Sequence, residues 1–205
     1  LDSGNKLENL IRLLIKKKNV DENITFIDLY NIHKITFTVT GTCLEKKCVE
    51  YFNHKLTPNM TVIKAIRITF SIPIIYNCVK YNGFTYVDGG LLDNYPIKIF
   101  KNDIKNTLGF YIYAENRSDE IIGVDNYILS ILLSMIRPHE INVVNKYVDN
   151  TIQIMCNVGA IQFNLHNDEK ENIILCTYNL IKSYFNTKMV SNIIIEFIDN
   201  IISKI

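Results

Sequence analysis

The pattern of apolar and polar positions in the first part of the chain alternates between helical and strand periodicity. Leucine and isoleucine recur at helical spacing and predict an amphipathic helix over Lys6–Lys18. Thr25–Tyr30 fits either a short helix or an extended lead-in. A run rich in β-branched residues predicts a strand over Ile35–Thr42, with a second strand, Cys48–Phe52, expected to pair with it.

The middle of the chain combines a helix with a hairpin. The pattern predicts a helix over Val62–Thr69 that ends before Pro73, because a proline ring disfavours helical backbone in the residue ahead of it. Two short extended runs, Asn77–Tyr81 and Phe84–Val87, flank the dipeptide Asn82-Gly83. Asn-Gly between apolar runs is the strongest short-range hairpin pattern, so these two runs are expected to pair.

The remainder of the chain continues to alternate strands and helices. Thr107–Tyr113 has apolar residues on both faces, as expected for an interior strand of a parallel sheet. The pattern beyond it predicts, in order, the helices Asp125–Ile136 and Ile141–Asn150, the strands Thr151–Cys156 and Ala160–Leu165, and the helices Asp168–Phe185 and Lys188–Lys204. No linker interrupts this order, so the sequence predicts one layered α/β domain over residues 1–205.

Asp88-Gly89-Gly90 is the most informative motif in the chain. It follows the apolar approach Thr85–Val87, so Asp88 is expected at a strand end, where glycines let the backbone turn without a Cβ clash. A carboxylate held there is well placed to accept a proton. The alternative is structural, because Asp-Gly is also a common tight-turn dipeptide and short motifs match often by chance.

The segment around this motif resembles the patatin-like phospholipases, lipid acyl hydrolases that use a Ser-Asp dyad. The resemblance is strongest over Thr61–Ile97 and weaker at Ile24–Tyr30 and Gln162–Phe185. Its matching features, in chain order, are Ala65 and Arg67, Ser71-Ile72-Pro73, Gly83, Asp88-Gly89-Gly90 and Asn94-Tyr95-Pro96. The resemblance implies a partial three-layer α/β/α domain with a central, mostly parallel sheet, of which this chain is the C-terminal part. It also implies that Asp88 is the proton acceptor of the dyad.

Several parts that acyl transfer needs are missing from the chain. The family carries its nucleophile in a Gly-x-Ser-x-Gly elbow, and neither this elbow nor an oxyanion loop occurs here. Ser3 has the wrong glycine spacing, and Ser71 at a helix exit is expected to bond local backbone. The serine and the oxyanion donors are therefore expected ahead of Leu1, and residues 1–205 alone are expected to be inactive.

Composition and charge narrow the range of partners. Twenty-two basic and twenty-one acidic residues give a net charge of +1, which offers no electrostatic case for binding nucleic acid. The five cysteines lack a CxxC pair and a matching His pattern, so we expect reduced thiols in an intracellular, cytoplasmic protein and no metal. The apolar runs Tyr127–Ile136 and Met189–Ile205 do not make a clean span of roughly twenty residues.

Two hypotheses of different classes follow from the sequence. In the first, the chain is part of a lipid acyl hydrolase that acts on phospholipid or another acyl lipid, without a cofactor and with peripheral membrane contact. In the second, it is a non-catalytic binding or scaffold module on the same fold, because a fold alone does not confer an activity. A Gly-x-Ser-x-Gly motif upstream of Leu1 would favour the first hypothesis.

Overall fold

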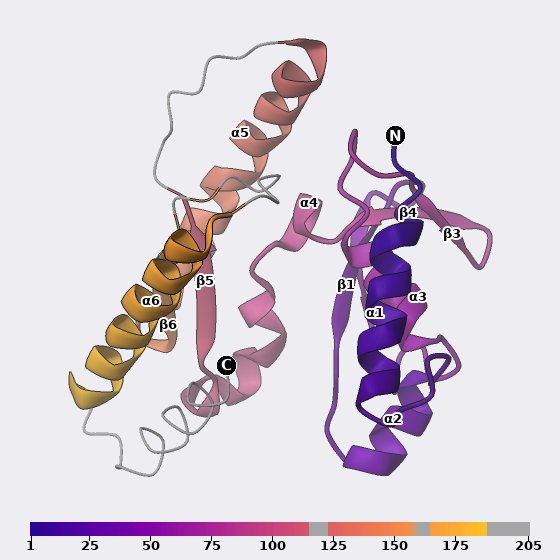
Figure 1. Ribbon diagram of the computed structural model, residues 1–205, viewed down its shortest axis with the longest axis horizontal. Helices are drawn as coiled ribbons and strands as arrows, with labels where there is room; N and C mark the ends of the chain where they lie inside the picture. The colour runs from indigo at the N-terminus through magenta and orange to yellow at the C-terminus, as the bar shows by residue number, and fades with distance from the viewer. Residues whose placement is uncertain (115–122, 157, 159–164, 188–205) are drawn as a thin grey trace. The chain divides into compact units, whose positions relative to one another are not determined.

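The computed structural model describes residues 1–114, 123–156, 158 and 165–187 (Figure 1). The chain divides into two compact units. The first unit comprises Leu1–Pro96 with Ile121–Val143, and the second comprises Ile97–Glu120 with Val144–Ile205. A single domain over 1–205 stays a prediction, and the two units are described separately.

The first unit is built on a four-stranded sheet with the strand order β2-β1-β4-β3. Its strands are β1 (Val39–Cys43), β2 (Cys48–Phe52), β3 (Val79–Tyr81) and β4 (Phe84–Asp88), and every neighbouring pair is antiparallel. Asn82 and Gly83 both have positive φ, 46° and 80°, as a two-residue hairpin turn requires. The predicted hairpin is therefore confirmed, and it leads the chain directly to Asp88.

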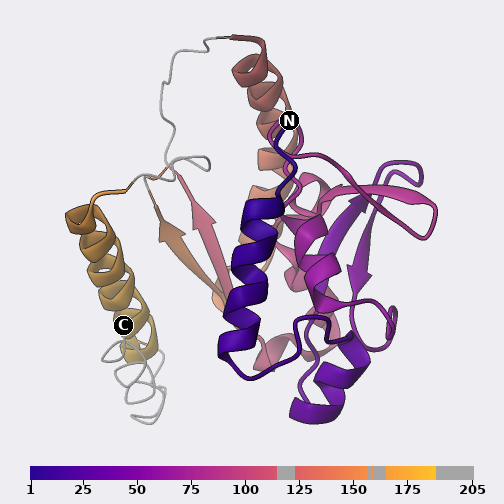
Figure 2. The same ribbon diagram turned by 45° about the vertical axis from the view of Figure 1, so that its right-hand side comes forward.

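Helices cover one face of this sheet. The helix α3 (Val62–Thr69) packs against β1 and β4, and α1 (Asn5–Lys17) lies against α3 (Figure 2). The segment after Thr25 forms a helix, α2 (Phe26–His33), because the Thr25 hydroxyl caps its first turn by accepting the Asp28 N–H at 3.2 Å. Of the two conformations that Thr25–Tyr30 allowed, the structure adopts the helix.

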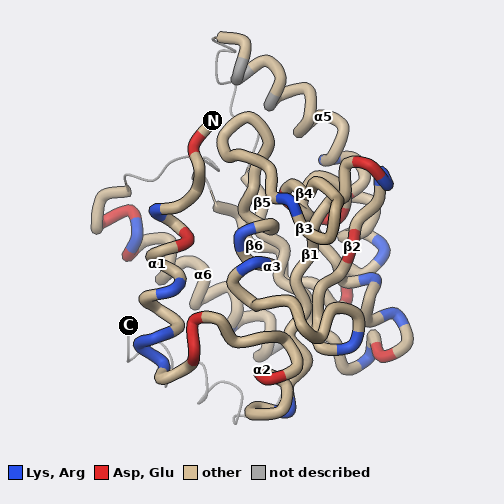
Figure 3. The backbone as a smooth tube through the Cα atoms, turned by 90° about the vertical axis from the view of Figure 1, so that its right-hand side faces the viewer, with Lys and Arg blue, Asp and Glu red and all other residues tan. Residues whose placement is uncertain are grey.

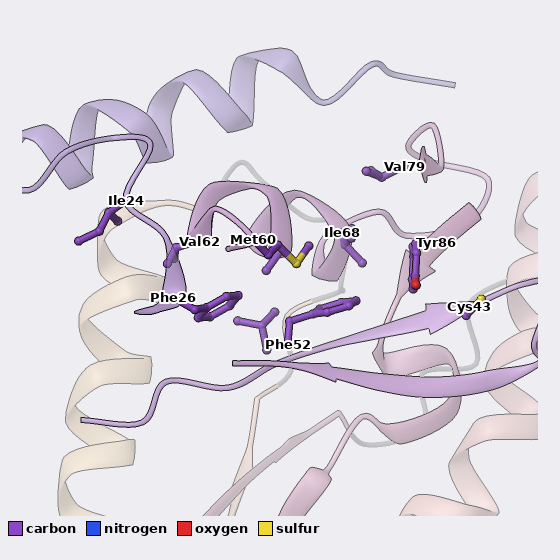
Figure 4. Close-up of a cluster of buried hydrophobic side chains, with 11 residues drawn as sticks. Ile24, Phe26, Cys43, Phe52, Met60, Val62, Ile68, Val79 and Tyr86 are labelled. Atoms are coloured by element: carbon purple, nitrogen blue, oxygen red, sulfur yellow. The ribbon is translucent and has the colours of Figure 1, made fainter. Parts of the chain in front are cut away.

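The core of the first unit lies between α3 and the sheet (Figure 4). Aromatic side chains make its centre: the Phe52 ring meets Tyr86 edge-on at 5.6 Å between centroids and Tyr81 at 6.4 Å. The buried members of the cluster are Ile24, Phe26, Val39, Cys43, Phe52, Met60, Val62, Ala65, Ile68, Val79 and Tyr86. This core fixes the position of β4, and hence of the residue that ends it.

The second unit contains the parallel strands β5 (Gly109–Tyr113) and β6 (Thr151–Met155), paired in register from Gly109 with Thr151. The Asn150 side chain donates to the carbonyls of Ile104 and Thr107, at 2.8 and 3.1 Å, and so ties the entries of both strands together. The other elements of this unit are η1 (Pro96–Asn106), η2 (Val148–Asn150) and α6 (Asn167–Thr187), which packs against β6.

Two predictions of element boundaries differ from the structure. The strand expected over Ile35–Thr42 begins only at Val39. The helices expected over Asp125–Ile136 and Ile141–Asn150 form a single helix, α5 (Gly123–Lys146), with Pro138 inside it. Proline removes only one backbone hydrogen bond, and the helix continues past it to the buried residues Val143 and Val144. The burial of apolar residues beyond Pro138 accounts for the continuation.

The mixed α/β fold class is confirmed. Among the described strands, parallel pairing joins β5 to β6, whereas the sheet of the first unit is antiparallel. The predicted strand Ala160–Leu165 and helix Lys188–Lys204 lie outside the described residues, apart from the end of the strand. Within the part of the chain that the structure covers, no helix combines the length and apolarity that crossing a bilayer requires. All five cysteines are free thiols.

Candidate functional site

Asp88 ends β4 and is held by its backbone from two sides. It pairs with Gly41 of β1, and its N–H donates to the Ser71 carbonyl at 3.0 Å. Ser71 follows α3, so the sheet and the exit of this helix together fix the Asp88 backbone. The sequence prediction of a carboxylate at a strand end is confirmed in its geometry.

Gly89 is needed for close packing and not for a special backbone angle. Its φ and ψ, −64° and −28°, are ordinary helical values that any residue adopts. A Cβ at this position would instead lie 2.6 Å from the backbone carbonyl carbon of Thr40. The motif joins β4 to the short helix α4 (Gly90–Asp93). The alternative that Asp88-Gly89 forms a hairpin turn is therefore wrong.

The environment of the Asp88 carboxyl favours proton uptake. Burial raises its pKa above the ordinary 3.8, and the Gly90 N–H, donating to Oδ1 at 2.8 Å, only partly opposes that rise. Within the described residues this is the hydrogen bond that the carboxylate accepts, so Oδ2 remains available for another donor. A half-buried carboxylate with a raised pKa is a stronger base than an exposed one.

The residues after the motif hold the loop in place. The Asp93 N–H donates to the Gly89 carbonyl at 2.9 Å, and the Tyr51 hydroxyl donates to Asp93 Oδ2 at 2.5 Å. The Asn94 amide lies against Gly90, because a Cβ on Gly90 would be 2.7 Å from Asn94 Oδ1. Asn94 therefore packs against the backbone of the motif.

Arg67 is a buried residue that the sequence reasoning did not assign a role. Its side chain is 6% exposed and donates to Ser71 Oγ at 2.6 Å, to the Ser3 carbonyl at 2.6 Å and to the Asn77 carbonyl at 3.2 Å. The Ser71 carbonyl accepts the Asp88 N–H, so Ser71 connects Arg67 to the Asp88 motif. Two sequence signals pointed to this residue: its place in the family resemblance and its spacing of one helical turn before Ser71.

Both serines considered in the sequence form hydrogen bonds with Arg67. Ser71 is 0% exposed, and its hydroxyl donates to the Arg67 carbonyl at 2.6 Å, which confirms the local backbone bonding expected for it. Ser3 precedes α1, where its carbonyl binds Arg67.

A cavity of about 470 Å³ adjoins α4 within the first unit. It lies between the segment that follows the motif and α5, and most of its lining is apolar. The lining residues are Leu91, Leu92, Asp93, Asn94, Tyr95, Leu132, Met135, Ile136, His139, Glu140 and Val143. Its size lies within the range of small-molecule sites, roughly 300–1,000 Å³.

The described part of the chain shows no group of three or more His, Cys, Asp or Glu side chains that could hold a metal ion.

We predict that Gly89→Ala destabilises the protein more than Gly90→Ala does. The first substitution drives a methyl group into the Thr40 backbone, which cannot move aside, whereas the second meets the end of the Asn94 side chain. Overpacking of this kind costs about 1–3 kcal/mol. Urea denaturation of both variants measures the difference, and equal losses would show that the Thr40 contact does not constrain the turn.

We predict that Asp88→Asn stabilises the protein at neutral pH. Because the folded state raises the pKa of this carboxyl, its ionised form lowers the free energy of unfolding above that pKa, and this cost disappears below the ordinary pKa of 3.8. Asparagine keeps an acceptor for the Gly90 N–H and carries no charge. Denaturation at pH 7 and at about pH 3 tests this, with a gain expected only at pH 7. A loss at pH 7 would contradict it.

Parts of the chain are similar to known proteins. Residues 1–101 match the model of the family described as patatin-like phospholipase. An uncharacterized protein of Acanthamoeba polyphaga mimivirus, R571, is 33% identical over 191 residues, which cover 88% of this chain and 63% of that protein. A protein of Invertebrate iridescent virus 6 named probable lipid hydrolase 463L is 30% identical over 95 residues, 45% of this chain and 33% of that protein.

A solved structure shows the same fold. The crystal structure of VipD from Legionella pneumophila matches with a TM-score of 0.59 at 15% identity, over 82% of this chain and 36% of VipD. The chain thus spans less than two thirds of each of these relatives. Residues 1–101 of this chain are thus similar to the patatin-like phospholipase family.

Proposed function

We propose that Asp88 is the general base of a lipid acyl hydrolase whose nucleophilic serine and oxyanion donors lie ahead of Leu1 in the full-length protein. The observation that carries this proposal is the position of Asp88: a half-buried carboxylate with a raised pKa, fixed at a strand end by β1 and by the Ser71 carbonyl. Perturbed carboxylates held in this way are candidates for proton transfer.

In the proposed reaction Asp88 accepts and returns a proton in each of two steps. Asp88 takes the proton of the serine hydroxyl as its oxygen attacks the ester carbonyl, and returns it to the departing alcohol when the tetrahedral intermediate collapses. Water then attacks the acyl-enzyme, with Asp88 accepting a proton from the water and returning it to the serine oxygen as the fatty acid leaves. The Gly90 N–H keeps Asp88 Oδ1 in place while Oδ2 faces the reacting hydroxyl.

The substrate class follows from the cavity and from the family. The apolar cavity beside α4 begins at Leu91, three residues after the proposed base, and is suited to an acyl chain. The relative named a probable lipid hydrolase supports the same class. We propose a phospholipid or another acyl lipid as substrate, reached by peripheral contact with a membrane in the cytoplasm.

We predict that Asp88→Asn lowers kcat of the full-length protein on a soluble short-chain ester by about 10²–10⁴-fold, the usual contribution of a general base. In the unsubstituted protein, kcat/KM should rise with pH through the raised pKa of Asp88. The matched control is Asp103→Asn at an exposed position, which should leave kcat unchanged. Unchanged turnover in Asp88→Asn would exclude the proposed role.

We predict that residues 1–205 alone do not hydrolyse the same ester, because they contain no Gly-x-Ser-x-Gly elbow. The full-length protein should be active under identical conditions. Measurable turnover by the isolated chain would mean that a serine within it is the nucleophile. A full-length protein that is inactive on every acyl ester tested would instead favour the binding-module hypothesis.

A further inference from the structure

The helix α1 exposes an apolar stripe to solvent. Leu10, Leu13 and Leu14 are 51%, 59% and 52% exposed, and their i, i+3, i+4 spacing places them on one face. The inward side of the helix is made by other residues, since Leu7, Ile11 and Ile15 are half-buried and α1 packs against α3. The three leucines are therefore not required to attach α1 to the first unit.

Within α1, the charged residues on the leucine face are positive. Lys6 and Lys17 are spaced four residues before Leu10 and three residues after Leu14, which places them on the leucine face, and Lys18 follows directly. The acidic residue of the helix, Glu8, lies away from this face and is paired with Arg12 at 2.7 Å. Figure 3 shows the basic positions recurring along α1.

This composition favours a membrane over a protein partner. Protein interfaces are depleted in lysine, whereas helices that lie on a bilayer combine an apolar stripe with flanking lysines that contact anionic headgroups. Lysine stems are long enough to keep their charges at the headgroups while the leucines enter the acyl region. The leucine stripe and its lysines are thus complementary to an anionic lipid surface.

We propose that the face of α1 formed by Lys6, Leu10, Leu13, Leu14 and Lys17 docks on an anionic bilayer. This inference deepens the proposed function, on which it rests, because it identifies the surface through which a lipid-hydrolysing protein reaches its substrate. The leucines insert below the headgroups and the lysines bind the anionic lipids above them.

Vesicle sedimentation of the full-length protein tests the leucines. The unsubstituted protein should bind vesicles of phosphatidylcholine with phosphatidylserine. The double variant Leu10→Glu, Leu13→Glu should bind them at least about tenfold more weakly. The control is Leu56→Glu, which changes a leucine of similar exposure, 64%, in a loop. Circular dichroism checks that each variant is folded. Equal binding by the double variant and the unsubstituted protein would overturn the proposal.

The contribution of the lysines is tested by removing their charges and by changing the lipid composition of the vesicles. Lys6→Gln with Lys17→Gln should weaken binding to the anionic vesicles roughly tenfold, and pure phosphatidylcholine vesicles should bind the unsubstituted protein weakly. Lys55→Gln, at an exposed position, is the matched control. Equal binding to both kinds of vesicle would overturn the anionic-lipid assignment.

Two further measurements distinguish this proposal from the Asp88 proposal and from self-association of the protein. The leucine variant should hydrolyse a soluble short-chain ester at the unsubstituted rate and lose activity only on vesicles, so a failure of the Asp88 proposal does not affect the binding result. If the unsubstituted protein binds no vesicles, and size-exclusion chromatography shows an oligomer that the leucine variant dissociates, then a second copy covers the stripe and the proposal is wrong.

Discussion

The buried guanidinium of Arg67 is the interaction on which the first unit most depends. Burying a charge costs several kcal/mol unless its donors are satisfied, and here two carbonyls and a hydroxyl receive them. The Phe70 and Tyr76 rings lie 5.2 and 6.0 Å from its central carbon. Gly4 leaves space for the group, since a Cβ there would lie 2.7 Å from that carbon.

This arrangement connects segments that are distant in sequence. One side chain joins the residues that precede α1, the segment that leads into β3 and the exit of α3. The exit of α3 in turn accepts the Asp88 N–H through the Ser71 carbonyl. The position of the candidate base thus follows from satisfying a buried charge, and a chemical role for Arg67 is not needed to explain its burial.

The Asp88 site combines rigidity with an electrostatic cost. Gly89 packs closely against Thr40, which restricts the backbone at this turn. Burial keeps the pKa of the Asp88 carboxyl raised. A protein tolerates such a cost most readily where function requires it. The core beneath β4 supplies the stabilisation that offsets it, with Phe52 and Tyr86 in direct ring contact.

Local patterns predicted the elements of the first unit well. The helix Val62–Thr69 and the strand Cys48–Phe52 have the predicted bounds, and Asn82-Gly83 forms the turn that its residue types favour. These predictions succeeded because periodicity and turn preference act within a few residues. The break expected near Pro138 failed because the helix continues past the proline to the buried residues Val143 and Val144.

The sequence by itself determined the order of these elements, the hairpin that delivers Asp88 and the resemblance to a lipid hydrolase family. Only the tertiary structure decided why Gly89 is a glycine, where the donors of Arg67 go and which face of α1 remains exposed. Each of these depends on contacts between residues far apart in the chain, such as Gly89 with Thr40 and Arg67 with Ser3. Local sequence patterns carry no information about such contacts, because they arise only when the sheet and its helices have packed together.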